Sequence, residues 1–192
     1  IPERPEELPA FAAQARGVYL QTATAEQITA WAVHLRLLNP EIVILWEPWE
    51  IFYEPDRLAE LELVARQVDI ICPQTVELSW MVGETEPNRQ LDKLLDCGFQ
   101  CVALRLGSDG SLVGASAIQQ HIEPVPITVV DETGAGNAYG GGFLVGYVES
   151  GGDVVTAGHY GAVAASFALT QVGVPALAGN IRSEAEARLR LI

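Results

Sequence analysis

The residues with the clearest capacity for chemistry lie in a glycine-rich segment, residues 129–142, which has the sequence V-V-D-E-T-G-A-G-N-A-Y-G-G-G. An apolar stretch that favours a strand comes before the glycines, and a helix is expected from Gly136 to about Glu149. Glycines at such a junction let backbone N–H groups converge on one point, and the helix N-terminus adds partial positive charge there. The segment therefore predicts a phosphate site that needs no cationic side chain.

Two other interpretations of this segment stay open at this point. It could be a turn whose glycines only allow close packing against a neighbouring helix. It could also be a dinucleotide-binding turn, because Gly134 and Gly136 begin a G-x-G-x-x-G pattern; however, the third glycine, Gly140, comes one position late, and a helix rather than a strand is expected next. A phosphate-binding loop of the G-x-x-x-x-G-K-[ST] type is excluded, because the only lysine is Lys93.

Strands and helices alternate along the chain before and after the glycine-rich segment. Apolar runs predict strands at residues 17–20, 42–46, 68–72 and 101–106, with further strand segments at 111–122 and 127–130. Helical spacing and end signals predict helices at residues 24–38, 55–67, 75–82, 89–97, 154–171 and 183–191. Strands that are almost entirely apolar and alternate with helices indicate a parallel sheet covered on both faces. We expect one α/β domain over residues 1–192.

The composition excludes several classes of function. Eleven Lys and Arg residues stand against 25 Asp and Glu, a formal net charge of −14, which argues against binding to nucleic acid or to an anionic membrane surface. Residues 154–181 carry no charge, but they are rich in small residues and are interpreted as a buried helix and a turn rather than a membrane span. Three cysteines without metal-ligand spacing favour reduced thiols and a cytoplasmic location.

Three motifs resemble those of the ribokinase (PfkB) family of sugar kinases. Residues 131–139, D-E-T-G-A-G-N-A-Y, resemble the family's D-x-T-G-A-G-D-x-F. Residues 73–77, P-Q-T-V-E, are similar to its P-N-x-x-E, and residues 104–110, L-R-L-G-S-D-G, to its T-L-G-x-x-G. Residues 164–173 are similar to the small-residue helix and glycine beside the family's adenine pocket. The resemblance implies a ribokinase-like, doubly wound and mostly parallel sheet with helices on both faces.

The same resemblance implies transfer of a phosphoryl group from MgATP to a hydroxyl of a sugar or nucleoside. By position, Gly134, Ala135 and Gly136 would form the anion hole for the γ-phosphate. Glu77 would organise Mg²⁺ through water, and Asp131 and Thr133 stand where some members bind K⁺ or another monovalent cation. The residues that would line the ATP site are Arg105, Gly107, Gly110, Ala164 and Gly173.

Three positions depart from the family pattern. Asn137 replaces the aspartate that deprotonates the acceptor hydroxyl, Gln74 replaces an asparagine, and Arg105 replaces a threonine. A minority fungal-type branch of the family is similar in pairing G-A-G-N with an arginine before L-G. We expect Arg105 to contact the phosphates or to pair with an acidic residue such as Glu77; the alternative is an arginine that reaches solvent at the end of its strand. Slow phosphoryl transfer is expected, while a nucleotide-binding pseudokinase that acts through protein interaction, or a protein that has lost ATP, stays open.

The family's first strands, its lid and its sugar-binding glycines have no counterpart in these 192 residues. The chain is therefore expected to be the C-terminal, nucleotide-binding portion of the fold, and a homodimer would form through that N-terminal lid. The acceptor cannot be named from this portion. The aromatic sequence W-E-P-W-E at residues 46–50 is either part of the core and its rim or a flank of the acceptor site.

Overall fold

The computed structural model of the chain describes residues 5–8, 10–22, 24–48, 58–116, 118–176 and 179–192. Within these residues the strands form one six-stranded sheet in the order β1-β2-β3-β4-β5-β6. The strands are β1 (Gly17–Thr22), β2 (Val43–Pro48), β3 (Ile70–Ile71), β4 (Cys101–Arg105), β5 (Ser111–Ala115) and β6 (Ile118–Ile122). Strands β1 to β4 run parallel, and β5 and β6 continue the sheet as an antiparallel hairpin.

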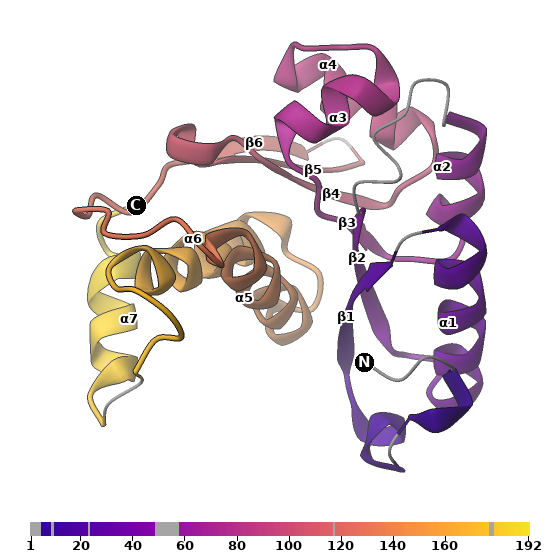
Figure 1. The fold of residues 1–192 in the computed structure, drawn as a ribbon, viewed down its shortest axis with the longest axis horizontal. Helices are drawn as coiled ribbons and strands as arrows, with labels where there is room; N and C mark the ends of the chain where they lie inside the picture. Colours follow the sequence, from indigo (N-terminus) through magenta and orange to yellow (C-terminus); the bar gives the residue numbers. More distant parts are fainter. Residues whose placement is uncertain (1–4, 9, 23, 49–57, 117, 177–178) are drawn as a thin grey trace.

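The helices cover both faces of this sheet (Figure 1). They are α1 (Ala25–Leu38), α2 (Leu58–Ala65), α3 (Thr75–Val82), α4 (Pro87–Asp96), α5 (Ala135–Ser150), α6 (Val154–Leu169) and α7 (Ile181–Leu189). Short 3₁₀ helices occupy Pro5–Glu7, Ala10–Gln14 and Gly107–Asp109. None of the helices in the described residues has the combination of length and hydropathy that a membrane span requires.

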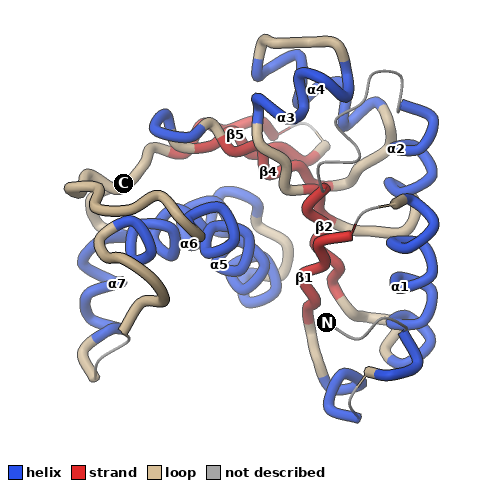
Figure 2. Tube along the Cα trace, viewed as in Figure 1, coloured by secondary structure: helices blue, strands red, loops and turns tan. Residues whose placement is uncertain are grey.

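Two hydrophobic cores result, one on each face of the sheet. Because side chains alternate along a strand, Ile44 and Trp46 of β2 enter the core beneath α1 to α4, whereas Leu45 enters the core beneath α5 and α6. The tube trace in Figure 2 shows α1 and α2 on one side of β1 and β2, with α5 and α6 on the other. This arrangement confirms the predicted α/β architecture.

Helices α5 and α6 pack closely because small residues lie between them. A Cβ atom added at Gly142 would lie 2.5 Å from the Cβ of Ala164 and 2.6 Å from the carbonyl oxygen of Tyr160. No larger side chain fits there without moving one of the helices. The glycines of the 129–142 segment therefore do contribute to helix packing, as one of the open interpretations held, although Gly136 lies elsewhere.

One predicted strand is wrong. Residues 127–130 are not part of the sheet; they have no regular secondary structure, and the Val130 N–H donates to the carbonyl of Leu169 at 2.8 Å. Pro124 and Pro126 remove two backbone donors just before this stretch, which prevents regular strand pairing there. The chain that leads into the glycine-rich segment and α5 thus lies against the end of α6 and is not a strand of the sheet. The strand at 68–72 is also shorter than predicted, since only Ile70 and Ile71 pair.

Candidate active site

The candidate site lies where the carboxyl ends of three parallel strands meet one edge of the sheet. Glu47 lies near the end of β2, Gln74 follows β3, and Arg105 ends β4. The Arg105 N–H donates to the carbonyl of Pro73 at 2.9 Å, and this bridge holds Gln74 beside Arg105. Ligands of open α/β sheets characteristically bind at such an edge.

A turn beneath Arg105 forms the floor of the site. The Leu106 N–H donates to the carbonyl of Gly110 at 2.9 Å, which closes the turn between β4 and β5. Gly110 has a φ of +81°, and a Cβ atom there would collide with the carbonyl oxygen of Ile122. The turn consequently requires glycine at this position.

The N-terminus of α5 faces this turn. Backbone N–H groups of the first turn of a helix lack an acceptor within the helix. That of Ala135 donates instead to the carbonyl of Glu132 at 3.2 Å, whereas no acceptor is found in the described chain for those of Gly136 and Asn137. The N–H groups of Gly136 and Asn137 are therefore the ones at the expected anion hole that could donate to a bound anion, and Gly134 is the N-cap in the left-handed region at a φ of +82°.

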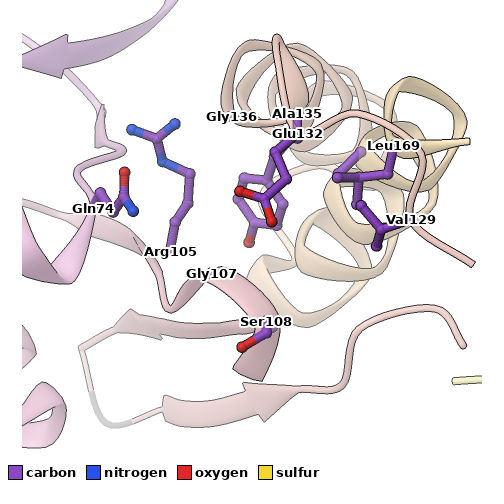
Figure 3. Close-up of a pocket in the computed structure, with 12 residues that line it drawn as sticks. Gln74, Arg105, Gly107, Ser108, Val129, Glu132, Ala135, Gly136 and Leu169 are labelled. Carbon is purple, nitrogen blue, oxygen red and sulfur yellow. The ribbon is translucent and has the colours of Figure 1, made fainter. Parts of the chain in front are cut away.

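A cavity of about 330 Å³ lies between these elements (Figure 3). Its lining comprises Gln74, Arg105, Gly107, Ser108, Gly110, Val129, Glu132, Ala135, Gly136, Tyr139, Ala165 and Leu169. In the close-up, Arg105 and Gln74 lie at one end, and Val129 and Leu169 lie at the other. The cavity therefore has a polar, cationic end and an apolar end, and its volume is within the usual range for small-molecule sites, about 300–1,000 Å³.

The guanidinium of Arg105 is buried between two carboxylates and α5. Its Nη2 lies 2.6 Å from Oε1 of Glu47 and 4.0 Å from Oε2 of Glu77, and the side chains of Arg105 and Glu47 are only 11% and 8% exposed. A Cβ atom at Gly136 would collide with Nη1 of Arg105, so only glycine admits the guanidinium there. The expected acidic partner is thus present, but the closer partner is Glu47 rather than Glu77.

Electrostatics at this edge are set by burial. Burial raises the pKa of the Glu47 carboxyl, and the charge and hydrogen bond of Arg105 offset part of that rise. Burial also raises the pKa of the Cys72 thiol to about 12, which keeps it protonated at neutral pH. Tyr139 is a buried residue of the cavity lining; its hydroxyl donates to Oγ of Ser111 at 2.8 Å, and burial raises its pKa as well. Among the described residues that line the cavity, Arg105 is the one with a cationic side chain.

The remaining predicted residues lie around the cavity. Glu77 is the third residue of α3, and its carboxylate accepts a hydrogen bond from the Gln74 N–H at 3.3 Å. Asp131 accepts the Thr133 N–H at 3.0 Å, and this hydrogen bond lowers the pKa of Asp131. Asn137 is exposed on the first turn of α5. These residues flank the cavity without lining it.

Two predicted lining residues lie elsewhere. Ala164 lines a second cavity, between α5, α6 and α7, while its neighbour Ala165 lines the candidate site. Gly173, with a φ of +80°, belongs to the exposed turn after α6. In the W-E-P-W-E sequence, Trp46 is buried in the core, and residues 49 and 50 lie outside the described residues.

Among the site residues that sequence reasoning missed, Glu47 is the one that pairs with Arg105. The available signal was a charged residue directly after the apolar run 42–46, on a strand predicted to be parallel to the one that ends at Arg105. Parallel strands bring their carboxyl ends to one edge, so the sequence could have placed Glu47 at the same edge as Arg105.

The model of the pfkB family of carbohydrate kinases matches residues 51–178. The chain belongs to this family. An uncharacterised sugar kinase of Archaeoglobus fulgidus is 29% identical over 63% of this chain and 48% of that protein. A protein of Schizosaccharomyces pombe is 30% identical over 71% of this chain and 45% of its own length. The chain thus spans about half the length, or less, of the curated relatives it matches.

Solved structures of the family share the fold over almost the whole chain. Arabidopsis thaliana ribokinase, complexed with ribose and ATP, superposes with a TM-score of 0.73 and 25% identity over 94% of this chain and 58% of that protein. Adenosine kinase of Sinorhizobium meliloti superposes with a TM-score of 0.76 and 24% identity over 96% and 58%, respectively. These likenesses confirm the ribokinase-like fold expected from the motifs.

Proposed function

We propose that this chain forms the nucleotide-binding part of a kinase that transfers a phosphoryl group from ATP to a hydroxyl of a sugar or nucleoside. The observation that carries the proposal is the cavity between the β4–β5 turn and the N-terminus of α5. It combines N–H groups that have no acceptor in the described part of the chain, a buried guanidinium and an apolar end. Phosphoryl transfer depends mainly on positioning and on stabilising negative charge, which these groups can provide.

The cavity's two ends suggest how a nucleotide would lie. The phosphates would approach Arg105 and the N–H groups of Gly136 and Asn137, where the helix terminus and the guanidinium both favour negative charge. The base would lie toward Val129 and Leu169 at the apolar end (Figure 3). Glu132 also lines the cavity, and its carboxylate would repel phosphate, so we place the phosphates on the Arg105 side. The ribokinase complexed with ribose and ATP supports ATP as the nucleotide.

The residues present also fit Mg²⁺ bound through water. Glu77 offers a carboxylate at the same edge as Arg105, and magnesium sites at phosphates commonly use one or two carboxylates and several waters. When bound, Mg²⁺ would neutralise charge on the phosphate oxygens. Asp131 and Thr133 remain the proposed location of a monovalent cation. No cluster of three or more His, Cys, Asp or Glu side chains suited to a metal is found within the described residues.

Asn137 determines how fast such a kinase could work. Its amide can accept a hydrogen bond from an acceptor hydroxyl and orient it, but it cannot remove the proton. Loss of a positioned base typically slows a reaction by about 10² to 10⁴. We therefore propose slow turnover. The same substitution favours the second candidate, a pseudokinase that binds nucleotide and acts through protein interaction.

The test uses the full-length protein with MgATP and a panel of sugars and nucleosides, and it follows ADP release. Acceptor-dependent ADP release supports the kinase. ATP binding without phosphorylation of any acceptor supports the pseudokinase, and the absence of ATP binding contradicts both.

A further inference from the structure

Glu47 stands out because it is charged and buried. Among the described residues no other charged residue is as deeply buried as Glu47, which has 6% of its surface exposed. Its Oε1 accepts a hydrogen bond from Nη2 of Arg105 at 2.6 Å, and the backbone of β2 fixes its position between β1 and β3. Burying a carboxylate is costly unless it is paired, so this position needs an explanation beyond sheet formation.

The pair is incompletely satisfied within the described chain. Oε2 of Glu47 and Nε of Arg105 are both buried and have no hydrogen-bond partner there. Buried polar atoms without partners are rare in folded proteins, and each one removes stability. With two unpartnered atoms, the Glu47–Arg105 pair contributes little to stability. It adjoins the cavity that we expect to bind a highly charged ligand.

Glu47 also determines where the guanidinium lies. Nη1 of Arg105 is directed at Gly136, at the N-terminus of α5, while Nη2 is held by Glu47. Without the Glu47 charge, the nearest carboxylate among the described residues would be that of Glu77, whose Oε2 lies 4.0 Å from Nη2. Because the arginine side chain has several rotatable bonds, an unrestrained guanidinium would occupy this position for only part of the time.

We propose that Glu47 is a positioning residue for nucleotide binding: it holds the Arg105 guanidinium against the N-terminus of α5, ready for the phosphates. The inference rests on the proposed function, since it assumes that the cavity receives a nucleotide. Fixing the cation before binding avoids the entropy loss of ordering it in the complex. Glu47 acts only through Arg105, so its effect must depend on the phosphates of the ligand and not on its adenosine portion.

The experiment measures the dissociation constants of ATP and of adenosine by calorimetry for the wild-type chain and Glu47→Gln. Glutamine keeps the shape and one acceptor oxygen but removes the charge. We expect ATP to bind at least tenfold more weakly, which corresponds to about 1.4 kcal/mol. Adenosine should bind with unchanged affinity.

Asp69→Asn is the matched control. Asp69 pairs with Arg36 at 3.0 Å, just before the amino end of β3, and so at the opposite edge of the sheet. This variant removes the charge of another ion pair in the same fold and should leave ATP affinity unchanged. If Glu47→Gln does not fold by circular dichroism, Glu47→Asp takes its place, because it keeps the charge but shortens the reach to Arg105. It should weaken ATP binding selectively as well.

The outcomes are distinguishable. Equal ATP affinity in the wild-type chain and the Glu47 variant overturns the positioning role and leaves the proposed function intact. Equal weakening of ATP and adenosine also overturns it, because a merely structural defect would affect both. If the wild-type chain binds neither ligand, the proposed function itself fails and the inference fails with it.

Discussion

Replacing Gly136 with alanine adds one methyl group at a crowded point of the candidate site. That methyl group would overlap Nη1 of Arg105, and it would lie 3.2 Å from Cζ of the same side chain. The guanidinium must therefore move, and we expect it to lose its place at α5 together with the 2.6 Å hydrogen bond to Glu47. Gly141→Ala, on the same helix, is the matched control, since no described atom beyond the adjoining turns of α5 lies within 4 Å of the added Cβ.

The two substitutions should separate binding from helix stability. Alanine in place of glycine within a helix stabilises it by about 0.5–1 kcal/mol, so Gly141→Ala should raise the melting temperature. Hydrogen bonds to charged groups contribute about 1.5–3 kcal/mol, so losing the Arg105 contact should weaken MgATP binding by about 10- to 150-fold in Gly136→Ala. Calorimetry on both variants measures the difference. Equal MgATP affinity in Gly136→Ala and Gly141→Ala would refute the role of this contact.

Three further predictions concern the rate, the packing and the pH dependence. Asn137→Asp should raise the acceptor-dependent rate of ADP release by the full-length protein at least roughly tenfold, with little change in ATP affinity, because it restores a base; an unchanged rate would contradict that role. Gly142→Ala should lower stability by about 1–3 kcal/mol in urea unfolding, because α5 and α6 must separate, whereas an unchanged midpoint would show that the helices yield easily. The Asp153 carboxylate accepts hydrogen bonds from the N–H groups of Thr156 and Val155, and these hydrogen bonds lower its pKa. The stability that this cap adds is therefore fully present above the ordinary aspartate pKa and is lost as the pH falls through the lowered pKa. The stability difference between wild type and Asp153→Ala should therefore shrink on acidification, and a constant difference would be evidence against this cap.

The sequence predicted most of the fold because periodicity and end signals were strong. Thr24 does cap α1, where its Oγ1 accepts the Gln27 N–H at 3.1 Å. The apolar runs before Pro48 and at residues 101–105 do form central strands. The strand predicted at residues 127–130 is wrong because a run that contains valines is typical of a strand in composition, although Val129 and Val130 are exposed here. The prolines before them and the end of α6 determine that stretch, and neither effect is visible in a local apolar run.

Prediction of the site depended on distance along the chain. The turn at Gly107 and Gly110 and the start of α5 are local, so their motifs revealed them. The pairing of Glu47 with Arg105 joins residues 58 positions apart, and it follows from the register of β2, β3 and β4 rather than from any local pattern. Likewise, Ala164 and Ala165 cannot be assigned to one cavity or the other until the rotation of α6 is known.

The central claim is that the cavity between the β4–β5 turn and α5 binds the nucleotide. Backbone amide NMR of the chain, titrated with MgATP, tests it directly. The account predicts saturable shifts that are largest at the Gly107–Gly110 turn, at Gly136 and Asn137, and at Ala165. Shifts gathered instead around the second cavity, at Gly142, or no shifts at millimolar MgATP, would contradict it.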